Sequence, residues 1–254
     1  MLTSISIKSL YPLALAEGEG VGTAYEYYAK RLILRRFLRQ IPAPRRILVA
    51  GLPEKYGSSL DFLLLAEELK AEVVVAEYRA EFIEKGKGSF AAAQRQNLLL
   101  NVSPRYVQVS DPARLSEIDG PFDLAICCEV LQSLPVNDRT VYWQRLRALA
   151  PAIALFTPNA GNPAHSTLSG LRTLSLDELK TLVRNTPSAQ VGLADLPPFP
   201  SGTTRSAAQR EQASTGVVES LAMWGLNYYA RLEPFLPLRV RQHYAHMVYA
   251  LSQG

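Results

Sequence analysis

Cysteine is almost missing from this 254-residue chain, and the two that occur are neighbours, Cys127 and Cys128. Adjacent residues of a strand point to opposite faces, so a disulfide between these two is not expected. Two adjacent cysteines also lack the ligand spacing of a zinc site, and we predict no metal centre. So little cysteine fits a reducing compartment, which predicts a cytoplasmic protein.

Long apolar runs are also lacking. No stretch approaches the roughly 18 apolar residues that a membrane-spanning helix requires. The first residues do not have the pattern of a signal peptide, so none is expected. Hydrophobic residues make up 48% of the sequence and charged residues 20%, which is the composition of an ordinary globular protein.

A large excess of one charge is absent as well, since the chain carries 27 basic and 23 acidic residues. The surplus is local, because residues 1–46 hold eight basic and three acidic side chains. A local patch is not the protein-wide field that drives nucleic-acid binding, so a nucleic-acid partner is not expected. Residues 24–40 are predicted to form a basic helix. It could touch an acidic substrate, a phospholipid surface (a peripheral membrane contact) or RNA, although a solvated helix face is the ordinary outcome.

The sequence does have a regular alternation of short apolar runs and amphipathic segments. Apolar runs predict strands at 47–50, 73–76, 106–109, 122–128 and 153–156. Helices are predicted at 58–69, 80–99, 138–149 and 175–184. This alternation predicts a parallel sheet with right-handed crossovers, an α/β fold of the Rossmann-like, doubly wound type. The loops that follow the strands should then face one crevice.

Both ends of the chain are predicted to add to this core. Residues 1–22 read as irregular. Segments 191–196 and 244–251 would complete a mostly parallel seven-stranded sheet, with an antiparallel last strand at its edge. Residues 206–231 are predicted to be helical.

The helix predicted over 206–231 has an apolar stripe at helical spacing, formed by Val217, Leu221, Trp224 and Tyr228. With the N-terminal helix it could cover the crevice as a lid that suits an apolar substrate, or it could pack in the core. We therefore divide the chain into an N-terminal helical segment (1–44), a Rossmann-like core (45–196) and a lid-like helical insertion with the closing strand (197–254).

Three stretches resemble class I S-adenosylmethionine-dependent methyltransferases. Val109-Ser-Asp-Pro-Ala-Arg-Leu115 is similar to the family's acidic adenine loop, and Phe122-Asp-Leu-Ala-Ile-Cys-Cys-Glu-Val-Leu-Gln-Ser-Leu-Pro135 is similar to its fourth strand. Phe156-Thr-Pro-Asn159 is similar to the segment after strand five in members that act on small molecules or lipids. The resemblance covers roughly Arg46–Arg184. It implies S-adenosylmethionine as the cofactor and methyl transfer to a small-molecule or lipid-like acceptor.

The resemblance also implies a nucleoside site at the ends of the strands. Glu77 matches the acidic residue that accepts hydrogen bonds from the ribose hydroxyls, and Asp111 matches the residue that recognises the adenine amino group. Glu129 would hold the substrate or the cofactor's amino group. Each residue also has an ordinary alternative: a solvated strand end for Glu77, a turn for Asp111 and a helix cap for Glu129.

The loop after the first strand departs from the family's pattern. Gly51-Leu-Pro-Glu-Lys-Tyr-Gly57 keeps two glycines, Pro53 stands where a glycine is usual, and Val49 replaces an acidic residue. We expect Gly51, Pro53 and Gly57 to line the cofactor, because glycines permit close backbone approach. The departure favours an alternative function, a catalytically inactive methyltransferase-like interaction or scaffold protein. A nicotinamide-dependent dehydrogenase is a third alternative, and its G-x-G-x-x-G fingerprint is absent.

His165 is the candidate catalytic residue, since it follows the strand at 153–156 on the crevice side. A general base is needed only when the acceptor must lose a proton, and a loop histidine without a role is the alternative. His243 and His246 are expected to pack or to face solvent.

No Asn-Pro-Pro-Tyr-type tetrapeptide follows the strand at 122–128, which argues against a nucleic-acid base as acceptor. The sequence leaves the oligomeric state open.

Overall fold

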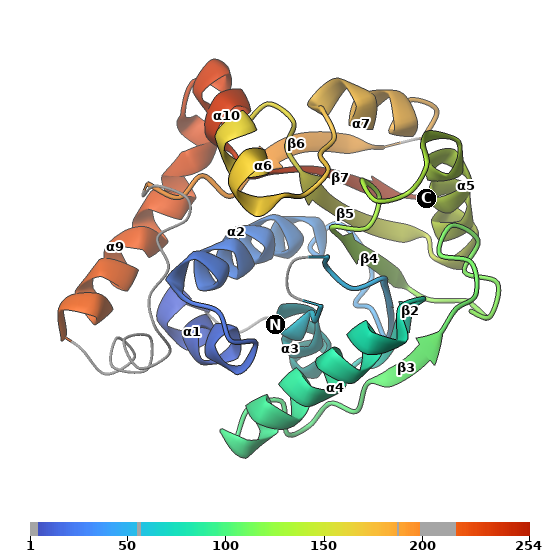
Figure 1. Cartoon of the computed structure of the whole chain (residues 1–254), viewed down its shortest axis with the longest axis horizontal. Helices are drawn as coiled ribbons and strands as arrows, with labels where there is room; N and C mark the ends of the chain where they lie inside the picture. Colours follow the sequence, from blue (N-terminus) through green and yellow to red (C-terminus); the bar gives the residue numbers. More distant parts are fainter. Residues whose placement is uncertain (1–4, 55–56, 187, 199–216) are drawn as a thin grey trace.

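A seven-stranded sheet forms the centre of the protein (Figure 1). The computed structural model describes residues 5–54, 57–186, 188–198 and 217–254. The strands are β1 (Arg46–Ala50), β2 (Glu72–Glu77), β3 (Arg105–Gln108), β4 (Leu124–Cys128), β5 (Ala152–Pro158), β6 (Gln190–Ala194) and β7 (Met247–Gln253). Their order across the sheet is β3-β2-β1-β4-β5-β7-β6.

The strand directions confirm the predicted doubly wound, mostly parallel sheet. β1 pairs in parallel with β2 and β4, β2 with β3, and β4 with β5. β7 is antiparallel to both β5 and β6, so the antiparallel last strand is confirmed. Its expected place at the edge of the sheet is wrong. β5 is buried along its whole length, and β7 supplies its second hydrogen-bonded neighbour, which leaves β6 at the edge.

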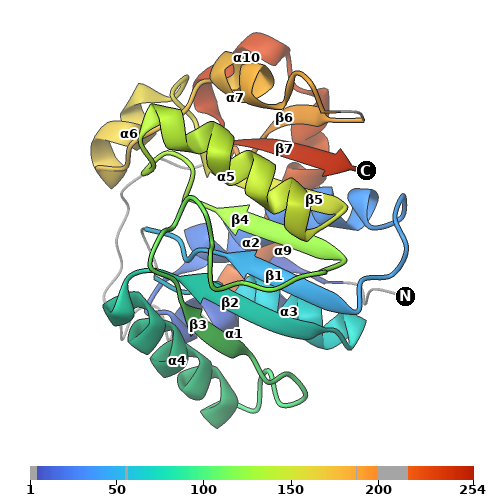
Figure 2. The same cartoon turned by 90° about the vertical axis from the view of Figure 1, so that its right-hand side faces the viewer.

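Helices cover both faces of the sheet. They are α1 (Ile7–Ala16), α2 (Val21–Phe37), α3 (Leu60–Leu69), α4 (Ala80–Arg95), α5 (Val136–Leu149), α6 (Pro163–Ser169), α7 (Leu176–Val183), α9 (Val217–Leu232) and α10 (Leu238–Tyr244), with a short 3₁₀ turn, η1 (Glu233–Phe235). The core on one face contains residues of α1, α2, α3 and α9, and the core on the other contains residues of α5 and α7. Figure 2 shows α5 in front of the sheet and α2 and α9 behind it.

The N-terminal segment is helical, so the prediction of an irregular stretch at 1–22 is wrong. α1 begins with a capping box, in which Ser6 and Ser9 each accept a hydrogen bond from the other's backbone N–H. Leu10 and Leu13 are buried, and α1 packs against α2, α9, α4 and α3. The segment is apolar over most of its length and contains Pro12, a residue that usually interrupts helices, so its pattern read as irregular.

The helix predicted over 206–231 is described from Val217 onward, as α9. Positions 206–216 of the predicted helix lie outside the described residues. Leu221, Trp224 and Tyr228 are exposed, so the alternative in which they pack in the core is wrong. In the part of the chain that the structure describes, no helix has the length and apolarity needed to cross a bilayer.

Candidate functional site at the carboxyl edge of the sheet

Gly51 opens the turn that follows β1. Its φ of +93° lies in the region that favours glycine, and its N–H donates to the carbonyl of Ala76 over 2.7 Å. A β-carbon at this position would lie 2.5 Å from Cγ2 of Val130. The side chain of Val130 therefore occupies the space that the absence of a side chain at Gly51 leaves open. A contact between Gly51 and a cofactor stays a prediction.

A backbone hydrogen bond joins Pro53 and Gly57 within the same loop. The N–H of Gly57 donates to the carbonyl of Pro53 over 2.8 Å, and both residues are buried. Gly57 has a φ of +66°, and the side chain of Lys85 lies against it from α4. Val49, where the resembled family has an acidic residue, is fully buried in the apolar core. The cofactor-lining roles of Pro53 and Gly57 remain predictions.

Glu77 ends β2 and is only 1% exposed, so the alternative of a solvated strand end is wrong. Its carboxylate accepts hydrogen bonds from the backbone N–H groups of Leu52 (2.7 Å), Tyr78 (2.9 Å) and Arg79 (3.0 Å). The guanidinium of Arg79 adds two more, from Nε (2.8 Å) and Nη2 (2.9 Å). A carboxylate offers about four lone-pair positions, so Glu77 is saturated by its own chain.

Arg79 is itself held in place beside Glu77. Its Nη2 also donates to the carbonyl of Leu52 over 2.8 Å, and its guanidinium lies 3.6 Å from the centre of the Phe82 ring. The ion pair therefore links the end of β2 to the loop after β1. The sequence resemblance pointed to Glu77 and gave no signal for Arg79.

Asp111 and Glu129 follow β3 and β4. Oδ1 of Asp111 accepts from the N–H groups of Ala113 (2.8 Å) and Arg114 (3.1 Å), which is the turn expected of an aspartate before a proline. Glu129 is buried with a φ of +54°, and its N–H donates to the carbonyl of Phe156. Strained non-glycine residues of this kind often occur at functional sites. Cofactor contacts by Asp111 and Glu129 stay predictions.

Gln132 is a site candidate that the sequence did not single out. It is fully buried, and its Oε1 accepts a hydrogen bond from Oγ1 of Thr157 over 3.1 Å. Its amide nitrogen has no hydrogen-bond partner among the described residues. Buried polar groups are nearly always paired, so this nitrogen offers a donor to a bound molecule or a water between the ends of β4 and β5.

A buried ionic cluster lies between α2, α3 and the end of β4. Lys30 is 1% exposed, and its Nζ lies 3.0 Å from carboxylate oxygens of both Glu26 and Asp61. The same Nζ lies 3.8 Å from Sγ of Cys128. Burial disfavours the charge, but Asp61 and Glu26 attract it and hold the pKa of Lys30 above its usual value.

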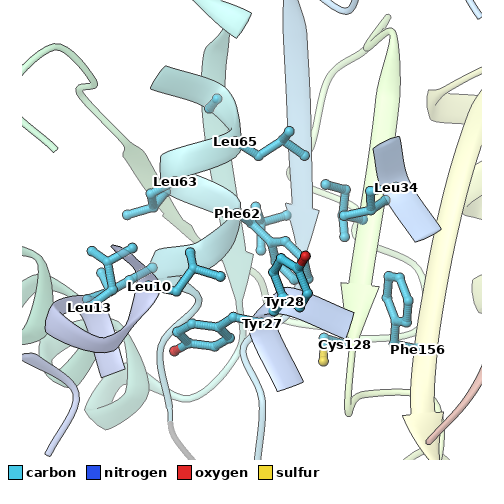
Figure 3. Close-up of a cluster of buried hydrophobic side chains, with 14 of the residues drawn as sticks. Leu10, Leu13, Tyr27, Tyr28, Leu34, Phe62, Leu63, Leu65, Cys128 and Phe156 are labelled. Carbon is cyan, nitrogen blue, oxygen red and sulfur yellow. The ribbon is translucent and has the colours of Figure 1, made fainter. Parts of the chain in front are cut away.

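The expected solvated basic face is therefore wrong for the middle of α2. Arg31 is buried as well and pairs with Glu68 over 3.3 Å. Figure 3 groups Tyr27 and Tyr28 of α2 with Phe62 of α3. These tyrosines belong to the core and are not part of an open lid.

Glu17 joins the turn after α1 to the start of α3. Its carboxylate accepts the N–H of Leu60 over 3.0 Å and the hydroxyl proton of Tyr27. Burial raises the pKa of Glu17 to about 8, although the hydrogen bond from Leu60 opposes the rise. Glu17 is therefore protonated in the folded protein at a pH where it is ionised in the unfolded chain.

We expect Glu17 to make folding stability decline between about pH 5 and about pH 8. Above its unfolded pKa the unfolded chain loses this proton and the folded chain keeps it, so stability is full below about pH 4.5 and is lost as pH rises toward the folded value. The predicted loss is on the order of 4 kcal/mol. Urea denaturation across this range should show a flatter profile for Glu17→Gln than for the wild type. Glu81→Gln, at an exposed position of α4, is the control. A constant difference between Glu17→Gln and the wild type at all pH values would contradict the prediction.

Two histidines and an aspartate lie at the same edge of the sheet. The rings of His165 in α6 and His246 are stacked, with centroids 3.9 Å apart and planes 9° from parallel. Nδ1 of His246 lies 3.0 Å from Oδ2 of Asp195, which is buried. His246 precedes β7, Asp195 follows β6, and Met247 pairs with Pro158 at the end of β5.

The expectation that His246 only packs or faces solvent therefore missed its contact with Asp195, beside His165. A buried tyrosine–glutamate pair continues this group. The hydroxyl of Tyr25 donates to Glu233, and the backbone N–H of Leu196 donates to the same carboxylate over 3.0 Å. Burial raises the pKa of Glu233 to about 7. The Tyr25 hydrogen bond opposes this rise, and the charge of Asp195 adds to it.

Neither the family models nor the curated protein sequences match this chain. Solved structures do match its fold. The small RNA methyltransferase HEN1 aligns at a TM-score of 0.50 and 13% identity, over 89% of this chain and 25% of that protein. The fold is that of S-adenosylmethionine-dependent methyltransferases.

Two further solved structures are similar at lower scores. Magnesium protoporphyrin IX methyltransferase (ChlM) of Synechocystis PCC 6803, solved with bound SAH, aligns at a TM-score of 0.47 and 12% identity, over 88% of this chain and 82% of that one. Phosphoethanolamine N-methyltransferase 1 of Haemonchus contortus, in complex with phosphoethanolamine and S-adenosylhomocysteine, aligns at 0.46 and 14%, over 88% and 40%. In this fold, Glu77 and His165 lie at the carboxyl edge of the sheet, where the sequence predicted them.

Proposed function

We propose that the protein transfers a methyl group from S-adenosylmethionine to a small-molecule or lipid-like acceptor. The methyltransferase fold supports this proposal, and the position of Glu77 carries it. This carboxylate lies at the carboxyl end of β2, beside the turn that begins at Gly51. In doubly wound folds, ligands bind outside the carboxyl ends of the strands.

Glu77 can bind the nucleoside part of the cofactor only if Arg79 first moves away from it. Ribose hydroxyls are hydrogen-bond donors, and Glu77 is an acceptor. Both oxygens of Glu77 are already occupied, so the guanidinium of Arg79 must leave before ribose can bind. Asp111 and Glu129 would provide further acceptors after β3 and β4.

When bound, the cofactor supplies a methyl group that its sulfonium has already activated. The work left to the protein is to place the acceptor in line and, for a hydroxyl acceptor, to receive a proton. In our proposal, Asp195 orients His246 through Nδ1, which leaves Nε2 to accept the proton. His165 stacks on that ring and holds it in position.

Calorimetry with S-adenosylhomocysteine tests the proposal. We expect the wild type to bind and Glu77→Gln to bind at least tenfold more weakly, because the amide loses one of the two acceptor oxygens. Glu72→Gln is the matched control, since Glu72 begins the same strand in an exposed position. Circular dichroism of each variant verifies folding. Equal binding by the wild type and Glu77→Gln would contradict the proposal.

The second candidate function is a methyltransferase-like scaffold protein without catalysis. The saturation of Glu77 by its own chain favours it, as does the apolar Val49. This function predicts that S-adenosylhomocysteine binds neither the wild type nor a variant in which Arg79 is removed.

A further inference from the structure

A cavity of about 310 Å³ lies between α2 and α9, apart from the carboxyl edge of the sheet. Its charged lining consists of five arginines, which are Arg31, Arg35, Arg36, Arg39 and Arg231. Arg31, Arg35 and Arg36 belong to α2, and Arg39 follows just after its end, so the four lie close together along the chain. Tyr28 lines the same cavity.

Most of this positive charge has no acidic partner in the described part of the chain. Arg31 pairs with Glu68, whereas no carboxylate among the described residues lies within 4.0 Å of Arg35, Arg36, Arg39 or Arg231. Like charges this close repel one another, and an anion relieves that repulsion. Planar guanidinium groups suit phosphate, which they can bind through two hydrogen bonds at once.

A stripe of exposed apolar side chains runs along α9 and η1. Its members are 49–81% exposed and recur every three or four residues, so the four that belong to α9 share one side of that helix. They are Leu221, Trp224, Tyr228, Leu232 and Phe235. We call this set the α9 stripe. So many exposed large apolar residues on one side indicate an interaction surface.

The helix that carries the α9 stripe is firmly docked by its other side. Met223, Asn227 and Ala230 are buried, and Oδ1 of Asn227 accepts the N–H of Ile7 over 2.8 Å. Figure 1 shows α9 at the periphery, outside α1 and α2. The exposure of the stripe is thus a property of the docked helix.

The arginine cavity and the α9 stripe share a border. Arg231 and Tyr28 both line the cavity, and Nε of Arg231 donates to the hydroxyl of Tyr28 over 3.0 Å. The guanidinium of the same arginine lies 5.8 Å from the centre of the Tyr228 ring, which belongs to the stripe. Cationic and apolar groups therefore form one continuous surface.

We propose that this surface binds membranes that contain anionic phospholipids. A headgroup phosphate would enter the arginine cavity, and the α9 stripe would insert its aromatic and leucine side chains at the level of the headgroups. Aromatic residues favour this depth, and basic residues attract anionic lipids. The proposal is independent of the proposed methyl transfer.

Two other occupants fit the surface less well. A symmetric pair of copies would bring the same patch of each chain together and set arginines against arginines. Single-stranded RNA would stack its bases on aromatic rings, but Leu221 and Leu232 offer no ring, and Phe235 lies beyond the end of α9. Charge complementarity together with an aliphatic stripe favours an anionic lipid surface.

Flotation of the full chain with vesicles tests the proposal. We expect vesicles of phosphatidylcholine and phosphatidylglycerol to bind the wild type at least tenfold more tightly than vesicles of phosphatidylcholine alone. Binding should weaken as salt is added. Trp143 is buried and Trp224 is 58% exposed, so a blue shift of tryptophan fluorescence on binding would report Trp224.

Two variants separate the two halves of the surface. Arg35→Gln/Arg39→Gln should lose at least tenfold in binding to the mixed vesicles, and Arg105→Gln/Arg172→Gln, which removes the same charge elsewhere, should not. Trp224→Ser should also weaken binding, whereas Leu100→Ser should not, although Leu100 is equally exposed at 58%. Phe235→Ser is a second stripe variant at a position 81% exposed, where a folding defect is not expected.

Several results would overturn the proposal. Equal binding to both kinds of vesicle, or to neither, would exclude an anionic lipid surface. Arginine-dependent binding of glycerol phosphate without vesicle binding would assign the cavity to a soluble phosphate ligand instead. Arginine-dependent binding of an RNA oligonucleotide alone would assign the surface to RNA. A dimer that dissociates in Trp224→Ser, without vesicle binding, would assign the stripe to a second copy of this chain.

Discussion

Replacing Lys30 by methionine is expected to lower the free energy of unfolding by about 3–5 kcal/mol. Lys30 is buried within 3.0 Å of two carboxylates, Glu26 and Asp61, which are themselves buried. Methionine fills a similar volume but leaves both charges without their cation. Removing one partner from a buried ionic group costs far more than the group contributes in net stability, because the remaining charge stays desolvated. Urea denaturation followed by circular dichroism measures the change.

An exposed pair provides the control for Lys30. Lys87 lies 2.7 Å from Glu84 on α4, and both side chains are more than half exposed. Lys87→Met should change stability by no more than about 0.5 kcal/mol. Adding Glu26→Gln and Asp61→Asn to Lys30→Met should recover part of the loss. A loss below about 1 kcal/mol for Lys30→Met alone would mean that water reaches the cluster.

The parallel sheet could be predicted because each strand has a local cause. β4 reads as a continuous apolar run, as a strand covered on both faces must, and each of its residues is buried. The capping box of Ser175 and Glu178 fixed the start of α7 in the same local way. The place of β7 has no such local cause, since it depends on which neighbour completes the hydrogen bonds of β5.

The burial of Lys30 and Arg31 could not be predicted from the residue pattern of the basic helix alone. Lys30 and Arg31 resemble the other cations of α2, and a charged helix face is usually solvated. Their burial depends on α3, whose Asp61 and Glu68 provide the partners, and on α1 and α9, which pack against α2. The residue pattern of 24–40 therefore does not indicate any of these contacts.

Sequence reasoning likewise found one part of the candidate site and missed another. The position of Glu77 follows from one strand end, so sequence reasoning found it. The pairing of His246 with Asp195 joins residues 51 positions apart and needs β6 and β7 to lie side by side. The occupation of Glu77 by Arg79 depends on a side-chain conformation that the carbonyl of Leu52 stabilises. A motif comparison reads residue types and does not detect which of their hydrogen-bonding positions are already in use.

Replacing Arg79 by alanine is expected to raise the affinity for S-adenosylhomocysteine by about 100-fold. In the wild type, ribose binding must first break the two guanidinium hydrogen bonds to Glu77, at 2.8 and 2.9 Å. Hydrogen bonds to a charged group each contribute about 1.5–3 kcal/mol, and a net gain equivalent to one of them, about 2.7 kcal/mol, corresponds to a factor of 100. The backbone N–H groups of Leu52, Tyr78 and Arg79 remain after the substitution and keep the carboxylate in place.

Calorimetry of Arg79→Ala beside Lys87→Ala, which removes a cation from an exposed position of α4, measures this effect. Arg79→Lys should fall between Arg79→Ala and the wild type, because an ammonium keeps the charge and loses the fork geometry that pairs with both oxygens. Weaker binding by Arg79→Ala would mean that the arginine helps to hold the nucleoside and does not block it. No binding by either Arg79→Ala or the wild type would favour the scaffold function, since the carboxylate would then be free and still fail to hold ribose.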